Sequence, residues 1–337
     1  MFKRTLRATA FALTLSAALG GAVHAAEKTE ITITKQPSIL YLPAIVMEKQ
    51  KLIEKQAAAL GLPNLTVQWR MFSGGGAATD ALLSNNVDIV NSGLGNLLLL
   101  WDRTRGGVKG IVTNSAQPVV LISREARIKT LKDFQPTDKI AVPTVRISTQ
   151  AILLQMASEQ AFGAGQWGKL DPNTVQLGHP DAAGALSNPK HEVASHFSAP
   201  PFDFQELKNI PGAHIVLSSA DIIKGGLSQS TLFTTTAFAK DNPKTIHAVI
   251  AASKEAVEYV KTHTRESVEM YKELSGDRTS IDDLMEMMKQ PGMMNFQTAP
   301  AGSMQFAAHM HKVGILKTEP RAWTEYFLPV AASLNGN

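Results

Sequence analysis

Between residues 73 and 101, apolar and polar positions alternate in blocks that predict a glycine turn, a helix, a buried strand and a second helix. Small apolar residues recur at helical spacing over 77–84. The short β-branched run 87–90 is typical of a parallel strand covered on both faces. A polar turn then leads into the apolar stretch 94–101. Two helix starts therefore follow turns here, and their free backbone N–H groups attract anions.

A weaker echo of this pattern occurs about a hundred residues later, over 182–194. A small-residue helix stops at Ser187-Asn188, and we expect a short apolar strand that contains Glu192. The polar stretch 195–201 follows. Two similar units indicate two lobes that aim their loops at a shared cleft, where ligands of open α/β sheets bind. The alternative is the ordinary recurrence of helix–turn–strand units in an α/β protein.

The remaining pattern alternates strands with helices, which is typical of an α/β protein. Period-two or short apolar runs predict strands at 31–34, 65–69, 108–112, 119–122, 139–142, 174–177, 213–217 and 232–235. Longer amphipathic runs predict helices at 41–60, 151–161, 243–260, 265–274, 281–289, 302–313 and 319–328. The strands at 119–122 and 232–235 are expected to carry the chain between the lobes.

The first 25 residues have the features of an export signal. Lys3, Arg4 and Arg7 form a basic start, 8–19 is apolar but too short to span a bilayer, and Val23-His24-Ala25 provides small residues for cleavage. We expect cleavage after the last of these and a mature protein in the periplasm. No cysteine follows the apolar stretch, so no lipid anchor is expected. The alternative is an uncleaved anchor.

Cleavage changes the charge balance. It reduces 33 Lys and Arg to 30, against 29 Asp and Glu, so the net charge falls from +4 to +1. A nearly neutral chain gives no reason to expect a nucleic-acid partner. The absence of cysteine excludes disulfides, thiolate metal sites and cysteine nucleophiles. At about 310 residues the mature chain can bury a large core, and its size favours two lobes.

Six short segments have the pattern of a known family: Gln36-Pro37, Leu42-Pro43, ALLSNNVDI at 81–89, IKTLKDF at 128–134, KIAVP at 139–143 and FAKDNP at 238–243. Together they resemble the sulfonate/taurine/nitrate-type substrate-binding proteins of bacterial ABC importers. The resemblance extends over about residues 30 to 330. It is more specific for the family than for any one ligand.

The resemblance implies the α/β, two-lobed periplasmic-binding-protein fold (type II), with two crossing strands and a cleft between the lobes. The first lobe is expected from 27–118 plus 233–337, and the second from 119–232. The implied function is capture of a small anionic solute by hinge closure. A monomer would then deliver the solute to a membrane permease that works with its ATPase.

By resemblance, the ligand contacts come from loops that follow strands in each lobe: Gln36, Ser73, Gly74, Gly75, Ser92, Gly93, Gln117, Ser148 and Thr149. Hydroxyls and backbone N–H groups suit a sulfonate, nitrate or carboxylate. Arg146 could add a bidentate contact. His196 and Phe197 lie in the polar stretch 195–201, where the family tends to place a cleft-facing residue. Solvated Arg146, helix capping by Ser148 and simple packing of His196 are the alternatives.

Catalysis has no support in the sequence. No G-x-S-x-G elbow occurs, and the histidines lack H-E-x-x-H spacing, so we expect neither an enzyme nor a metal or cofactor. Import of a thiamine-type pyrimidine precursor and ligand sensing in the periplasm remain open. A pyrimidine-synthesising enzyme of the same fold is less favoured, because its cysteine-rich segment is missing here.

Overall fold

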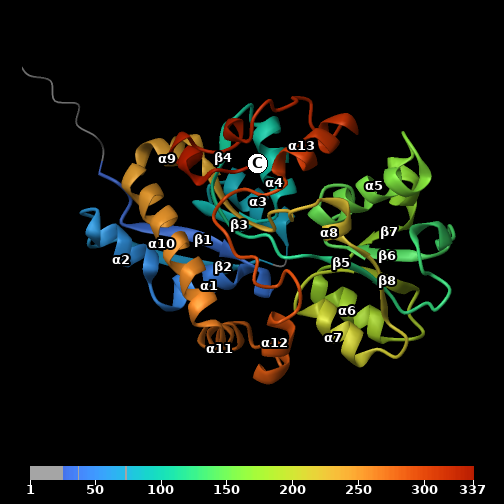
Figure 1. The fold of residues 1–337 in the computed structure, drawn as a ribbon. Helices are drawn as coiled ribbons and strands as arrows, with labels where there is room; N and C mark the ends of the chain where they lie inside the picture. Colours follow the sequence, from blue (N-terminus) through green and yellow to red (C-terminus); the bar gives the residue numbers. More distant parts are fainter. Residues whose placement is uncertain (1–25, 37, 73) are drawn as a thin grey trace, which may run out of the picture.

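Two five-stranded sheets, each among its own helices, organise the chain (Figure 1). The computed structural model describes residues 26–36, 38–72 and 74–337. Within them, no helix combines the length and the apolar character needed to cross a bilayer. The expected export signal lies outside the described residues.

The first sheet has the order β2 (Thr66–Met71), β1 (Glu30–Lys35), β3 (Ile89–Ser92), β10 (Ser230–Thr235) and β4 (Val108–Ser115). β1 runs parallel to β2 and β3, whereas β10 is antiparallel to both of its neighbours. The helices between these strands are α1 (Leu42–Lys49), α2 (Leu52–Ala59), α3 (Gly75–Leu83) and α4 (Leu94–Arg103).

The second sheet repeats this plan with the order β7 (Thr174–Gln176), β6 (Lys139–Val142), β8 (Val193–Ser198), β5 (Val120–Ser123) and β9 (His214–Ser218). β6 is parallel to β7 and β8, and β5 is antiparallel to β8 and β9. Its helices are α5 (Thr149–Phe162), α6 (His179–Ser187), α7 (Phe202–Asn209) and α8 (Ser219–Ile222).

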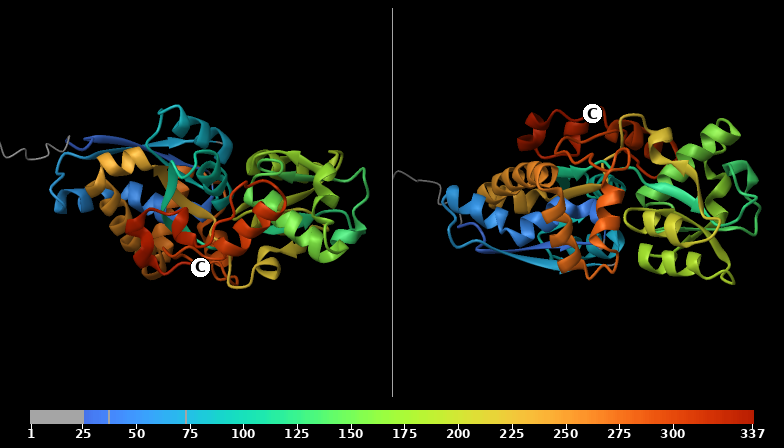
Figure 2. Two further views of the ribbon diagram at one scale, coloured as in Figure 1. Left: turned by 90° about the horizontal axis from the view of Figure 1, so that it is seen from above. Right: turned by 60° about the horizontal axis from the view of Figure 1, so that its bottom comes forward.

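The C-terminal third returns to the first sheet as α9 (Thr236–Asp241), α10 (Pro243–Thr262), α11 (Thr264–Ser275), α12 (Ile281–Met288) and α13 (Ser303–Lys312). α10 packs on α1 and α2, whereas α13 contacts both α4 and α5 (Figure 2). We call the part built on the first sheet the first lobe and the part built on the second sheet the second lobe.

The chain passes between the sheets twice, and the two passages are joined. The amide of Val119 donates to Ser219 Oγ at 3.0 Å, and the amide of Ser219 donates to the carbonyl of Val119 at 2.9 Å. Ser230 already pairs with Ser115 in the first sheet. The return therefore lies before Ser230, and the boundary expected at 232/233 falls inside β10. The division into two folding units stays a prediction.

Several predicted elements differ in detail. The helix expected over 41–60 is broken at Lys51, whose left-handed φ of 52° ends α1 before α2 begins. The helix expected over 319–328 is wrong: only 3₁₀ turns occur, at Trp323–Glu325 and Pro329–Leu334. Its backbone instead bonds to Gly110 of β4, because the amide of Leu328 donates to the Gly110 carbonyl.

Residues 195–198 of the polar stretch expected at 195–201 belong to the strand β8 (Val193–Ser198), and Glu192, which was expected inside a strand, precedes it. Two of its buried polar side chains have partners inside the lobe. Ser195 Oγ donates to Ser123 Oγ at 3.0 Å, and His196 bonds to Glu206. The polarity of the side chains therefore gave no indication of a buried strand here, because polar groups that have hydrogen-bond partners are readily buried.

Candidate ligand-binding site

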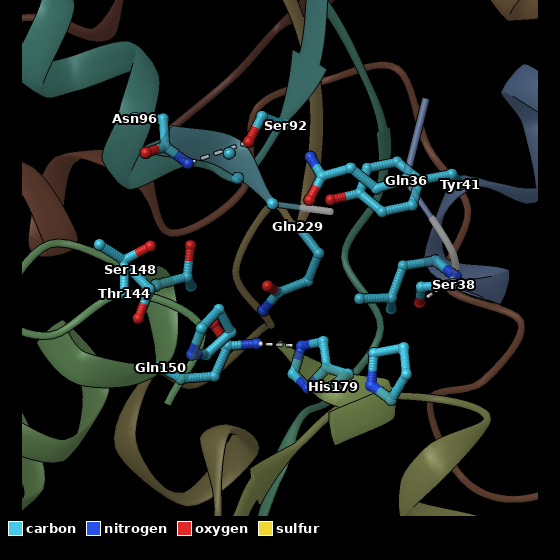
Figure 3. A pocket seen from close by; sticks show the side chains of 17 residues that line it. Gln36, Ser38, Tyr41, Ser92, Asn96, Thr144, Ser148, Gln150, His179 and Gln229 are labelled. Carbon is cyan, nitrogen blue, oxygen red and sulfur yellow. Dashed lines mark hydrogen bonds between the residues drawn. The ribbon is translucent and has the colours of Figure 1, made fainter. Parts of the chain in front are cut away.

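A small cavity lies between the two lobes, and both contribute to its wall (Figure 3). Its volume is about 60 Å³. The lining residues are Gln36, Ser38, Leu40, Tyr41, Gly74, Gly75, Ser92, Gly93 and Asn96 from the first lobe, Pro143, Thr144, Ser148, Thr149, Gln150, His179 and Pro180 from the second, and Gln229 from the returning passage.

Four helices begin at this cavity. The starts of α3 and α4 reach it from the first lobe, and the starts of α5 and α6 reach it from the second. The first turn of a helix carries N–H groups without intrahelical partners and the positive end of the helix dipole. Among the described lining residues there is no Lys, Arg, Asp or Glu. The cavity is therefore electropositive without carrying a formal positive charge.

The first-lobe wall is built by close approach at glycine. A Cβ on Gly75 would lie 2.1 Å from Asn96 Nδ2 and 2.4 Å from Ser92 Oγ. These two side chains are themselves bonded, with Asn96 Nδ2 donating to Ser92 Oγ at 2.9 Å. Gln36 is held in place because its Nε2 donates to the carbonyl of Asn91 at 3.0 Å. Only a residue without a side chain lets α3 begin against this pair.

The second-lobe wall begins with the cap of α5. Ser148 Oγ accepts from the amide of Ala151 at 3.3 Å, which is ordinary N-capping. The next hydroxyl, Thr149 Oγ1, is buried and has no hydrogen-bond partner among the described residues. A Cβ on Gly93 would lie 2.7 Å from that oxygen, so the lobes meet closely at this glycine.

Gln229 supplies a second buried group without a partner. The side chain is 3% exposed and extends between the two walls in Figure 3. Its Nε2 has no hydrogen-bond partner within the described chain. Buried polar atoms are nearly always paired, so an unpaired amide and an unpaired hydroxyl in one cavity indicate a site for a polar ligand.

Behind the second-lobe wall lies a series of hydrogen-bonded side chains. Gln150 Nε2 is 3.3 Å from His179 Nε2, His179 Nδ1 is 2.9 Å from His196 Nε2, and His196 Nδ1 is 2.6 Å from Glu206 Oε1. Burial lowers the pKa of His196 to about 3. It also lowers the pKa of His179 well below the ordinary value, and the neighbouring His196 adds to this effect. Burial raises the pKa of Glu206 to about 8.

The structure brings seven of the predicted site residues to the cavity: Gln36, Gly74, Gly75, Ser92, Gly93, Ser148 and Thr149. Their contact with a ligand stays a prediction. Ser73 lies outside the described residues. His196 does not line the cavity but lies one hydrogen bond behind His179.

Two of the predicted site residues, Gln117 and Arg146, do not line the cavity. Gln117 does not line the cavity, because its Nε2 donates to the carbonyl of Met293 next to the passages. Arg146 is exposed and has a left-handed φ of 66°. It lies near Asp171, where its charge opposes the larger upward effect of burial on the pKa of that carboxyl. A bidentate contact from Arg146 to a ligand in this cavity has no support in the geometry.

Sequence reasoning missed most of the polar lining. The missed residues are Ser38, Tyr41, Asn96, Thr144, Gln150, His179 and Gln229. Gln150 directly follows the predicted pair Ser148-Thr149, so the helix start itself was a usable signal. His179 begins the helix that we expected to include 182–187, and a helix start after a strand was again the available indication.

Comparison with known proteins agrees with this architecture. A model of the NMT1-like family matches residues 24–274. The aliphatic sulphonate binding protein SsuA of Escherichia coli superposes with a TM-score of 0.66 and 17% identity, over 89% of this chain and 99% of that one. The alkanesulfonate-binding protein SsuA of Xanthomonas axonopodis pv. citri, bound to MOPS, superposes with a TM-score of 0.69 and 14% identity. The match covers 91% of this chain and 99% of that one. The nitrate-binding protein NrtA of Synechocystis PCC 6803 superposes with a TM-score of 0.66 and 13% identity. The match covers 91% of this chain and 86% of that one.

These likenesses confirm the predicted two-lobed periplasmic-binding-protein fold. A different match is partial: the β′ subunit of DNA-directed RNA polymerase of Buchnera aphidicola subsp. Schizaphis graminum is 29% identical over 121 residues. The matched stretch covers 36% of this chain and 8% of that protein, so it does not bear on the molecule as a whole.

Proposed function

This chain belongs to the NMT1-like family, and we propose that it is the solute-binding subunit of an ABC importer that captures a small anion. The observation that carries the proposal is the cavity itself. Four helix starts from two lobes converge on a space whose described lining includes no formal charge. Such a site stabilises negative charge through N–H groups and dipoles.

The size of the cavity favours a compact ligand or head group. A nitrate, the sulfonate end of a short alkanesulfonate or a small carboxylate suits a cavity of about 60 Å³. The similar solved structures are sulfonate- and nitrate-binding proteins, so import of a pyrimidine precursor is not favoured. The ligand would accept hydrogen bonds from Thr149 Oγ1 and Gln229 Nε2, which have no partner in the described chain.

Capture by closure fits the contacts that join the lobes. Ser38 Oγ donates to the carbonyl of Pro200 across the cleft at 2.6 Å. Lys312 on α13 of the first lobe pairs with Glu159 on α5 of the second lobe at 2.7 Å. A ligand that touches both walls would favour this closed arrangement, because only a difference in affinity between open and closed states shifts their balance.

The partner and location follow from the same proposal. A binding protein of this kind would act as a monomer in the periplasm and dock in its closed form on a permease coupled to an ATPase. It would perform no catalysis. A sensing role would use the same cavity and is distinguished by whether the loaded protein stimulates ATP hydrolysis by a permease complex.

Thermal unfolding and calorimetry test the ligand class. The mature chain is titrated with nitrate, methanesulfonate, taurine and formate, and with dimethyl sulfone as the neutral isostere of methanesulfonate. At 100 times its Kd, a true ligand adds about 2.7 kcal/mol of stability. We expect at least one anion to stabilise the protein and dimethyl sulfone to have no effect. Stabilisation by the neutral isostere alone would contradict the proposal.

A further inference from the structure

The geometry points to proton-coupled capture: the anion is bound together with one proton, which the series Glu206–His196–His179 takes up and presents to the cavity as an N–H on His179 Nε2. This inference rests on the proposed function, because it assumes an anionic ligand. Its basis is a continuous series of hydrogen bonds that ends at the cavity wall.

The number of protons in the series decides which group donates in each of its hydrogen bonds. With Glu206 ionised and both rings neutral, His196 Nδ1–H donates to Glu206 Oε1, and His179 Nδ1–H donates to His196 Nε2. His179 Nε2 then carries a lone pair and accepts from the amide of Gln150. With one more proton, Glu206 donates to His196 Nδ1, and His196 Nε2–H donates to His179 Nδ1. His179 Nε2 then carries a hydrogen, which it offers to the cavity or to the amide oxygen of a rotated Gln150.

An anion distinguishes these two arrangements. A lone pair on His179 Nε2 repels an oxyanion, whereas an N–H at the same position donates to it. The protonated series is also electrically neutral, whereas the other holds a buried carboxylate behind the wall. Binding therefore selects the protonated arrangement, and one proton enters from solvent wherever the series was ionised.

The surroundings of Glu206 determine where this exchange occurs on the pH scale. Its side chain is 1% exposed, and Oε2 has no partner in the described chain. Burial of this carboxylate raises the pKa of Glu206 to about 8, although the nearby Ser198 hydroxyl acts in the opposite direction. The two histidines that face it are neutral at that pH, because burial lowers the pKa of each.

Other titratable groups lie on the elements around Glu206. Asp203 lies one turn earlier on α7, and burial, with a contribution from the Glu206 charge, raises its pKa to about 7. Lys208 on α7 is paired with Asp283, and Gln205 reaches toward Asp277. α6 contributes His179 and the exposed Asp181, and β5 carries no titratable side chain. Asp203 is thus the group that a test must separate from Glu206.

The expected dependence of the affinity on pH follows from the fraction of protein in the protonated arrangement. If only that arrangement binds, the apparent affinity falls about tenfold per pH unit above pH 8 and is nearly constant from pH 6 to 7. At pH 10 binding is about 100-fold weaker than at pH 7. Nitrate and methanesulfonate are the right probes, because neither takes up a proton in this range.

Calorimetry in two amine buffers of different ionisation enthalpy measures the proton directly. Sulfonate buffers are avoided, because they belong to the proposed ligand class. We expect uptake near zero at pH 6.5 and near one proton at pH 9.5. Glu206→Gln should abolish the uptake and flatten the affinity between pH 7 and 10. The matched control, Asp203→Asn, should retain both. Binding of the probe without uptake at pH 9.5 would overturn the inference while leaving the proposed function intact.

A measurement on the free protein keeps the inference testable if no probe binds. ¹⁵N NMR of the imidazoles should show His179 Nε2 changing from a lone-pair nitrogen to N–H as the pH falls through about 8 in wild type, but not in Glu206→Gln. A His179 Nε2 that keeps one state from pH 6.5 to 9.5 refutes the series as a proton carrier. Failure of every anion to bind, with this switch present, refutes the proposed function and with it anion capture, but leaves the series as a proton carrier.

Discussion

At the scale of single residues, neighbouring hydroxyls on α5 have different roles. Ser148 caps the helix, because its Oγ accepts from the amide of Ala151. Thr149 caps nothing, and its buried Oγ1 has no partner among the described residues. Burying an unpaired hydroxyl lowers the stability of the fold, and because this one also lines the cavity, a ligand is its expected partner.

Thr149→Val tests that explanation, because it keeps the shape of the side chain and removes the oxygen. A hydrogen bond to a charged ligand contributes about 1.5–3 kcal/mol, so the Kd should rise roughly 10- to 150-fold. The melting temperature should stay the same or rise. Ser158→Ala is the control, because Ser158 Oγ is also buried and unpaired on α5 but does not line the cavity. Equal affinity in wild type and Thr149→Val, measured by calorimetry, would place the ligand elsewhere.

Glu206 also makes the stability of the free protein depend on pH. Its pKa is raised to about 8, so between pH 6.5 and 8 the folded state holds a proton that the unfolded chain has released. The free energy of unfolding should therefore fall as the pH rises through this window, by up to about 2 kcal/mol. Asp203, with a pKa of about 7, contributes to this fall in the lower-pH part of the window.

Below pH 6.5 the buried His196 has the opposite effect, because the unfolded chain binds a proton that the folded ring excludes. Urea unfolding at pH 6.5, 7.2 and 8 measures the slope. Glu206→Gln should reduce it, since only the contribution of Asp203 remains. An unchanged slope in this variant would show that Glu206 does not hold the proton.

At the scale of elements, the site depends on how closely helix starts approach one another. α3 begins against the pair Ser92–Asn96 of β3 and α4, and a Cβ at Gly75 would overlap both side chains. At Gly76, one residue further along α3, a Cβ would have nothing within 4 Å. The two glycines therefore separate the effect of close approach from that of helix propensity.

Gly75→Ala should displace the Ser92–Asn96 pair and weaken anion binding by about tenfold or more. Its stability should fall by about 1–3 kcal/mol, as for other overpacked positions. Gly76→Ala should leave affinity unchanged and raise stability by up to about 1 kcal/mol, because Ala is the better helix former. Calorimetry and urea unfolding of both variants check this. Comparable affinities in the two variants would show that the start of α3 does not hold the ligand.

At the scale of the whole molecule, ion pairs between the lobes support the closed arrangement. Lys312–Glu159 and Lys208–Asp283 each join the first lobe to the second. All four side chains are at least partly exposed, so each pair contributes only about 0–1 kcal/mol. They adjust the balance between open and closed forms, whereas the ligand decides it.

Lys312→Glu should therefore weaken anion binding by about two- to fivefold, since it replaces an attraction across the cleft with a repulsion. Adding Glu159→Lys should restore the affinity. Lys261→Glu is the control, because Lys261 pairs with Glu258 inside α10 and crosses no cleft. Calorimetry measures the affinities, and small-angle scattering should show a larger radius of gyration for unliganded Lys312→Glu. Failure of the charge swap to rescue binding would contradict this role.

The sequence by itself determined the order of elements and the places where helices begin after turns. Hydrophobic periodicity, turn residues and N-capping act within a few residues, so the starts of α3, α4 and α5 could be predicted, as could Gly75, Ser92 and Thr149 near them. The same local information failed where distant partners decide the outcome. β8 is buried because Ser195 and His196 bond to β5 and α7, and 319–328 is not helical because it bonds to β4.

Only the tertiary structure decided which side chains share the cavity. Arg146 is exposed and does not line the cavity, although it stands two residues before the cap of α5. Gln229 and His179 face the cavity because the returning passage and α6 are brought to it by the order of the two sheets, over separations that no local pattern records. The series His179–His196–Glu206 joins α6, β8 and α7 in the same way. Its hydrogen-bonding direction depends on burial, which is a property of the folded molecule and not of any one residue.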